Sequence, residues 1–238
     1  MALSADLTPE ALQAALPGRP LRSYVAVVST GSVAHGWASE GAPDGAVVVA
    51  DHQLSPRGHA GRPLKDPPGQ GLGFSVVMRP ALPVAREGWL YTLVLTALTD
   101  VFGEASSVEW PDEVRRDGAM LGAVGVYTRL DEAGGGILWA IVDVLLPDAA
   151  PPRGQLLAAV LEAIDARAAG SAGAVLRDYD RVCDTIGRQV RARLRAGTGP
   201  RVEGRALETL EDGAIVLETP KGLRAPVRPH DVRRLEGM

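Results

Sequence analysis

Val47–Arg62 reads VVVADHQLSPRGHAGR, a run of apolar residues followed directly by a polar loop. The run VVVA has no polar residue at alternate positions, so it predicts a strand buried on both faces. The stretch after it contains two arginines, two histidines and three helix-breaking residues, and it therefore predicts a loop at the end of that strand. A basic, glycine-containing loop in this place raises the question of which ligand it binds.

Composition limits the classes of protein to which the chain can belong. Its 238 residues, 46% of them hydrophobic, are enough for one large domain with a real core and a second small one. The net charge of -4, without a block of consecutive basic residues, predicts no binding to nucleic acid. No apolar stretch reaches the roughly 18 residues of a membrane span, and nothing before Ala11 resembles a targeting signal, so we expect a cytoplasmic protein.

Cysteine and lysine are both scarce. The single cysteine, Cys183, excludes an internal disulfide and a cysteine-cluster metal site, and it is read as a small packed residue. Of the 25 basic residues, only Lys65 and Lys221 are lysines. Any chemistry that needs a lysine amine therefore has two candidates in the whole chain.

Hydrophobic periodicity predicts helices and strands mixed along the first three quarters of the chain. Helices are expected at 7–16, 32–40, 87–102, 155–168 and 174–183, and strands at 24–28, 45–50, 72–78, 107–110, 122–128 and 136–146. From Gln189 to Leu235 the pattern changes to short strands separated by glycine and proline, which is typical of a small β-barrel. We therefore predict an α+β domain over 1–186, with a mixed sheet and helices, and a small β-barrel domain over 187–238.

Eight separated blocks, taken in order, resemble one family of enzymes. The blocks are VSTG (28–31), DGAVVVADHQ (44–53), PRGHAGR (56–62), GLGFSVVMRP (71–80), VEWPDEV (108–114), MLGAVGV (120–126), DYDRVCDTIG (178–187) and HDVRRL (230–235). Together the blocks resemble the biotin protein ligases over nearly the whole chain, in the short form that lacks a helix-turn-helix domain. The resemblance implies a class II synthetase-like catalytic fold followed by an SH3-like barrel. It also implies ATP-dependent biotinylation of a lysine on a carrier domain through biotinyl-adenylate, with biotin, ATP and magnesium as ligands. The lipoate ligases share the catalytic fold.

The residues that face biotin in the family are largely kept. Ser29, Thr30 and Gln53 match its pocket, although Gly31 replaces an asparagine. The family's glycine- and arginine-rich loop wraps the biotin carboxylate and the phosphate of the adenylate. In this loop Arg57, Gly58, Gly61 and Arg62 match, whereas Pro56 replaces a glycine and His59 an arginine. The resemblance thus predicts a loop that still binds an anion, but more weakly.

The nucleotide side departs further from the family. Glu109-Trp110-Pro111-Asp112-Glu113 stands where the family has lysine, tryptophan, proline, asparagine and aspartate. The sign reversal at Glu109 is large, since unit charges about 4 Å apart interact by roughly 4 kcal/mol at an effective dielectric constant near 20. Met120, two residues before the matching Gly122, replaces a lysine that stabilises the adenylation transition state. Losing such a group commonly costs about a hundredfold to a thousandfold in rate. The segment AIVDV, with Asp143, has lost the glycines and the asparagine of the family's strand near adenine.

Each candidate residue also has a purely structural interpretation. Ser29 and Thr30 are suited to cap a helix, and Arg57 and Arg62 to form an ordinary charged surface. Trp110 is more typical of a core than of a ligand contact. Asp112 and Glu113 could hold magnesium, but adjacent side chains usually diverge, which favours solvated charges. His35, His52 and His59 lack metal-ligand spacing, so no metal site is predicted from them.

Three hypotheses for the function follow from these departures. The first is a working biotin ligase, in which Arg57 acts at the reacting carboxylate and the Met120 position is compensated elsewhere. The second is a catalytically silent relative that binds a small carboxylic acid or a carrier domain. The third is an acyl transferase that uses an already activated donor. The lost lysines favour the second, and a homodimer is left open.

Overall fold

The computed structural model describes residues 3–132, 135–194 and 201–237. The chain folds into two compact units, each made of two segments. The first comprises Met1–Val84 and Met120–Glu162, and the second comprises Ala85–Ala119 and Ala163–Met238.

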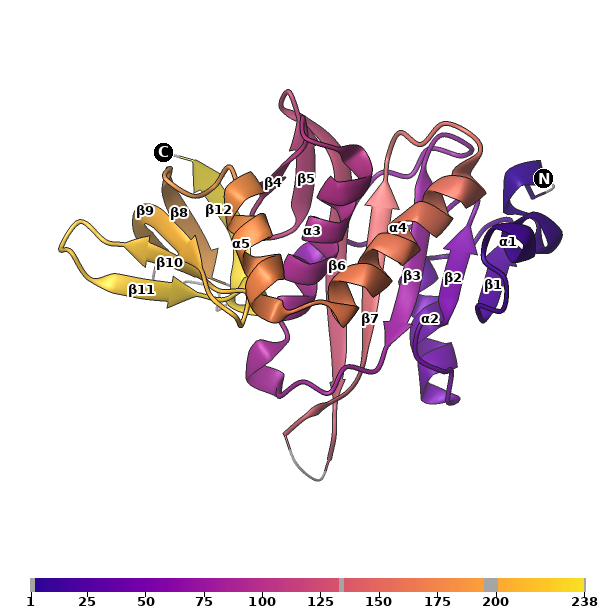
Figure 1. Ribbon diagram of the computed structural model, residues 1–238, viewed down its shortest axis with the longest axis horizontal. Coiled ribbons are helices and arrows are strands. Elements are labelled where there is room, and N and C mark those ends of the chain that lie inside the picture. The colour runs from indigo at the N-terminus through magenta and orange to yellow at the C-terminus, as the bar shows by residue number, and fades with distance from the viewer. Residues whose placement is uncertain (1–2, 133–134, 195–200, 238) are drawn as a thin grey trace. The chain divides into compact units, whose positions relative to one another are not determined.

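The first unit is built on five strands in the order β1-β2-β3-β7-β6 (Figure 1). These are β1 (Leu21–Tyr24), β2 (Val47–Ala50), β3 (Leu72–Met78), β7 (Ile137–Leu146) and β6 (Ala119–Leu130). Strands β1 and β2 are parallel, and the remaining neighbours are antiparallel. All four residues of β2 are buried, as its unbroken apolar run predicts.

The strand expected at 24–28 is instead β1, three residues earlier. The reason is its partner, because Leu21 to Tyr24 pair in register with the VVVA run of β2. Beyond Tyr24 only Val27 forms an isolated bridge, to Gln53, before the chain enters the next helix.

The helices of the first unit begin where the sequence places their caps. The Thr8 side chain accepts a hydrogen bond from the Ala11 N–H at the start of α1 (Pro9–Ala15), and Ser29 accepts one from Ser32 at the start of α2 (Thr30–Ser39). Helix α2 packs on β2, β3 and β7. Its small residues Ala34 and Ala38 are buried in that contact, so the helix backbone lies close to the sheet.

A buried ion cluster joins the first residues of the chain to the start of α4 (Arg153–Ala169). The guanidinium of Arg153 donates to Asp6 at 3.0 and 3.2 Å and to Asp51 at 2.8 Å, and the Arg153 side chain is only 2% exposed. Asp51 also accepts from the Ser4 hydroxyl at 2.6 Å. The 3-10 helix Ala5–Leu7 is thereby fixed to the end of β2.

The second unit contains two helices, a hairpin and a separate sheet. Its helices are α3 (Trp89–Phe102) and α5 (Ala172–Val182), and its hairpin is β4 (Ser107–Glu109) with β5 (Glu113–Arg116). The sheet has the order β11-β10-β9-β8-β12, formed by β8 (Gln189–Leu194), β9 (Arg201–Thr209), β10 (Ile215–Glu218), β11 (Arg224–Val227) and β12 (Val232–Gly237). Further 3-10 turns occupy His59–Gly61, Val84–Arg86 and Pro229–Asp231.

The predicted α+β class, with a mixed sheet, helices and a C-terminal sheet, is confirmed. Cys183 is 5% exposed, and burial raises the pKa of its thiol. Closure of the C-terminal sheet into an SH3-like barrel and a domain boundary near Ile186 stay predictions, since the compact units divide the chain at other positions. Across the described ranges, the helices are too short or too polar to traverse a lipid bilayer.

Candidate functional site

A small pocket in the first unit contains four of the residues that the sequence assigns to acid binding, without Gly58, His59, Gly61 and Arg62 of the same loop. Its lining comes from the start of α2, the loop after β2, and strands β6 and β7. The lining residues are Ser29, Thr30, Gln53, Pro56, Arg57, Leu64, Ala123, Asp143, Val144 and Leu145. Four separate stretches of sequence therefore meet here, and Ser29, Thr30, Gln53 and Arg57 are among them.

A chain of hydrogen bonds runs along the wall of the pocket. Gln53 Oε1 accepts from both the N–H and the hydroxyl of Thr30, at 2.8 and 2.9 Å. The Ser75 hydroxyl lies 2.7 Å from the Thr30 hydroxyl and 2.6 Å from Oδ1 of Asp143. The backbone N–H of Gln53 donates to the Asp66 carboxylate at 2.8 Å, and this bond fixes the position of Gln53. The pocket thus has preset polar groups, which are what a binding site for a polar ligand needs.

Asp143 joins this chain although the sequence assigns it to the nucleotide side. It stands directly opposite Ser75 in the pairing of β3 with β7, and opposite Gly125 in the pairing of β6 with β7. Burial raises the pKa of its carboxyl to about 7, against the lowering effect of the Ser75 hydrogen bond. The carboxyl therefore holds its proton to a higher pH than an exposed aspartate does.

Gly31 is the residue that makes room for Asp143. A Cβ added at Gly31 would lie 2.6 Å from both carboxylate oxygens of Asp143. A side chain at position 31 would therefore force the Asp143 carboxylate to move.

Replacing Gly31 with alanine should lower the free energy of unfolding by about 1–3 kcal/mol, the usual effect of forcing a methyl group into a filled space. In an Asp143→Ala background the same change should be neutral or slightly stabilising, because alanine favours helix by up to about 1 kcal/mol over glycine. Urea unfolding of the four proteins of this double-mutant cycle measures the coupling.

The matched control for this cycle is Gly36→Ala in the same helix. A Cβ at Gly36 would meet nothing within 4 Å, so the change should stabilise the protein in both backgrounds. Equal effects of Gly31→Ala with and without the Asp143 carboxylate would contradict the proposed contact.

The arginine-bearing loop folds back over the sheet. Gly58 donates its N–H to the Arg62 carbonyl, and Leu64 donates to the Pro56 carbonyl. A Cβ added at Gly125 in β6 would lie 3.2 Å from the Gly58 backbone, so the loop backbone rests against that strand. The predicted loop residues divide by exposure. Arg57, Gly61 and Arg62 are exposed, whereas Gly58 and His59 are buried.

On the predicted nucleotide side, acids compensate the available cations. Arg115 donates to Glu109 at 2.7 Å and to Glu113 at 2.6 Å. The indole of Trp110 donates to the Gly213 carbonyl, and the side chain is 2% exposed, so it is a core residue of the second unit. Asp112 and Glu113 are also buried, so the interpretation of these two residues as solvated charges is wrong.

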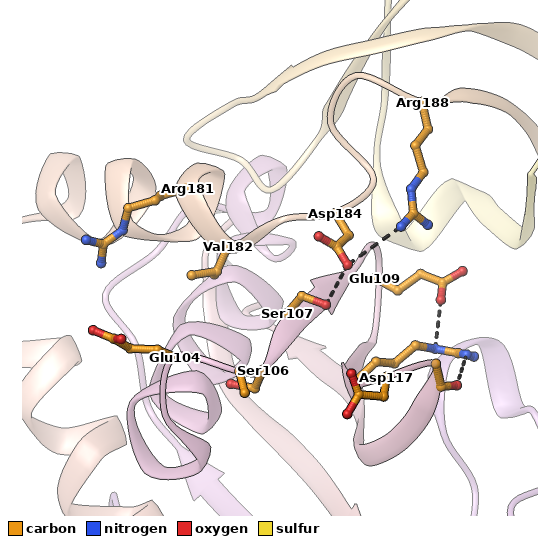
Figure 2. Close-up of a pocket in the computed structure, with 12 residues that line it drawn as sticks. Glu104, Ser106, Ser107, Glu109, Asp117, Arg181, Val182, Asp184 and Arg188 are labelled. Carbon is orange, nitrogen blue, oxygen red and sulfur yellow. Dashed lines mark hydrogen bonds and ion pairs between the residues drawn. The ribbon is translucent and has the colours of Figure 1, made fainter.

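A larger pocket of about 590 Å³ in the second unit has Glu109 and Arg115 in its wall. Figure 2 shows Asp184 between Ser107, which donates to it at 2.7 Å, and Arg188, which lies 3.6 Å from it. The arginines of the wall, Arg115, Arg181 and Arg188, each lie within ion-pair distance of a carboxylate. A phosphate would have to compete with these acids for each cation.

The remaining predicted residues lie apart from the first pocket's wall. Gly122 is buried in β6, where its neighbour Ala123 is the lining residue, and Met120 is partly exposed near the start of that strand. Sequence reasoning missed Ser75, whose only signal is a hydroxyl in an otherwise apolar buried strand. The described residues contain no group of three or more acids, histidines or cysteines that could hold a metal ion, so the fit of magnesium has no support in them.

Comparisons with known proteins give homology and fold. No family model matches the chain. The bifunctional ligase/repressor BirA of Bacillus subtilis is 25% identical over 244 residues, which cover 90% of this chain and 74% of that protein. The biotin protein ligase of Aquifex aeolicus, solved with biotin and ATP, superposes with a TM-score of 0.70 at 20% identity, covering 92% of this chain and 99% of that one. A biotin protein ligase-like protein of unknown function from Silicibacter gives 0.68 at 16% identity, covering 90% and 96%.

Proposed function

We propose that this chain, a homologue of the biotin protein ligases with their fold, binds a small carboxylic acid in the pocket of its first unit and does not activate that acid with ATP. This is the second of the three hypotheses, a binding protein built on a ligase scaffold. The observation that carries it is the contrast between two sets of residues. Thr30, Gln53 and Ser75 form an ordered polar wall. Arg115, the arginine that directly follows the nucleotide block, is already bound by two glutamates.

The polar wall supports acid binding on physical grounds. The hydroxyls and the amide are positioned by hydrogen bonds within the protein, so they lose little freedom when a ligand binds. Arg57 is exposed, belongs to the lining, and offers a guanidinium suited to pairing with a carboxylate. These groups support the proposal that the pocket binds an acid.

The cations argue against productive binding of ATP. Positions 109 and 120 hold glutamate and methionine instead of lysine. Lys65 is exposed and lies beyond the arginine-bearing loop in the sequence. Arg115 is the nearest arginine in sequence to the nucleotide block, but Glu109 and Glu113 already neutralise its charge. A triphosphate would therefore meet carboxylates beside Arg115, Arg181 and Arg188, which weakens its attraction to these arginines.

A working ligase is the alternative, favoured by one observation. The Aquifex aeolicus ligase, which has a similar fold, was solved with biotin and ATP together. Under either hypothesis a carrier domain is the predicted macromolecular partner. A cytoplasmic location and a homodimer stay predictions as well.

Calorimetry with biotin, lipoate, short fatty acids and ATP, each added separately, tests the proposal. At least one acid should give a saturable heat, and ATP should give none up to millimolar concentration. Arg57→Gln should weaken acid binding by about tenfold or more, because a charge-assisted bond is lost. Arg129→Gln, which removes an exposed guanidinium from β6, is the matched control and should change nothing. Tight binding of ATP together with no binding of any acid would overturn the proposal.

A further inference from the structure

The lining of the first pocket includes a carboxylate, that of Asp143, which would repel the carboxylate of an acidic ligand. Asp143 Oδ1 accepts from Ser75 at 2.6 Å. For Oδ2 no hydrogen-bond partner is found among the described residues, and this oxygen lies beside the space that Gly31 leaves open. Asp143 is partly exposed, so a ligand that donates to this oxygen replaces its contact with water by a charge-assisted hydrogen bond.

The charged residues of the lining are Asp143 and Arg57, one of each sign. No bond joins them among the described residues: Asp143 has Ser75 as its partner, and Arg57 donates to the Gly61 carbonyl at 3.4 Å. The raised pKa of Asp143 has burial as its largest cause, and no cation contributes to it. The lining thus contains one acidic side chain, Asp143, and one basic side chain, Arg57, that do not bond to each other.

The titratable and charged groups around Asp143 are few. Its two sheet neighbours present Ser75 from β3 and Gly125 from β6. Helix α2 presents Thr30 and Gly31, and the loop presents Arg57. Arg57 is the charged side chain among them, so ionisation of Asp143 depends on what the ligand brings.

The free space is narrow. The cavity measures about 10 Å³, roughly the room of one water molecule. A slender head group displaces less of the loop and the wall than a fused ring does. Both size and charge therefore favour a single protonated amine at the inner end of the ligand.

We propose that the pocket takes a short carboxylic acid with a protonated amine at its far end, with Asp143 binding the ammonium group and Arg57 the carboxylate. The proposal rests on the proposed function and names its substrate class. A straight ω-amino acid satisfies both charges at once. A plain fatty acid leaves Asp143 without a donor, and it is therefore discriminated against.

Calorimetry with matched pairs of acids tests this assignment: γ-aminobutyrate against butyrate, and ε-aminocaproate against caproate, with biotin as a neutral N–H donor. At pH about 8, where Asp143 is ionised, at least one of the two amino acids should bind at least about tenfold tighter than the acid of the same length without the amine. The advantage should shrink as the pH falls through about 7, because a protonated carboxyl no longer attracts the ammonium group. At neutral pH, binding should also release protons, seen as a heat that varies with the ionisation enthalpy of the buffer.

Asp143→Asn removes the charge but keeps the shape, so it should abolish both the advantage and the proton release while plain acids bind as well or better. Asp148→Asn, at an exposed position just beyond β7, is the matched control and should leave both unchanged. Equal binding of plain and amino acids by the unmodified protein would overturn this inference and leave the proposed function standing. Preference for biotin over every amino acid would identify a neutral donor and also overturn it. Absence of binding by any acid would overturn both.

Discussion

Replacing Arg153 with methionine should lower the free energy of unfolding by about 3–5 kcal/mol, the usual effect of removing one partner from a buried ion cluster. The side chain is 2% exposed and bonds to Asp6 and Asp51, so its loss leaves two carboxylates uncompensated. Arg129→Met, at a 55% exposed ion pair with Glu132, is the control and should stay within about 0.5 kcal/mol. Urea unfolding measures both, and a loss below about 1 kcal/mol for Arg153→Met would contradict the assignment.

The same cluster predicts a pH dependence for that difference. Hydrogen bonds from Arg153 and Ser4 hold the pKa values of Asp6 and Asp51 below the ordinary 3.8. A carboxyl with a lowered folded-state pKa contributes stability above the unfolded value and loses it as the pH falls through the folded one. The gap between the unmodified protein and Arg153→Met should therefore be full at neutral pH and narrow below pH 3.8.

The unmodified protein should not exchange pyrophosphate into ATP in the presence of biotin. The double variant Glu109→Lys with Met120→Lys should restore measurable exchange, because a single well-placed donor changes such rates by about a hundredfold to a thousandfold. Glu109→Lys also removes one of the two acids that bind Arg115, whose pairing with Glu113 remains.

The control is the double variant Glu132→Lys with Leu130→Lys. It changes the net charge by the same amount, at two exposed positions outside the nucleotide block. It should show no exchange. Robust exchange by the unmodified protein would contradict the proposed loss of activation and support a working ligase. Transfer from added biotinyl-adenylate or from an acyl thioester to a carrier lysine, without exchange, would support the acyl transferase instead.

Patterns within a single element allowed much of the fold to be predicted. Strand β2 is an unbroken apolar run, β3 is apolar except for Ser75, and α3 is buried along most of its length, so each carries its own signal. The short strand β1 is only partly buried, and its position depends on its partner. Strand β5 reads EVRR, and this charged sequence gives no strand signal, so it was missed.

Site residues could be predicted where they belong to a motif of the resembled family. They could not be predicted where the pairing of two strands brings distant residues together. The resemblance predicts one acid-binding pocket for Ser29, Thr30, Gln53 and Arg57. The contact between Ser75 and Asp143 spans 68 positions and exists because the register of β3 with β7 puts them opposite each other. No local pattern in either strand encodes that register, so Asp143 was assigned to the nucleotide and Ser75 to none.

The docking of the arginine-bearing loop on β6 has a kinetic consequence. Gly58 rests against Gly125, and the cavity that Asp143 and Arg57 line has room for about one water, so we expect the loop to lift before a larger ligand enters. Binding then has two steps, with opening first. At high ligand concentration the observed rate of association should therefore reach a plateau set by the opening rate, which is a property of the protein and equal for every ligand that the pocket accepts.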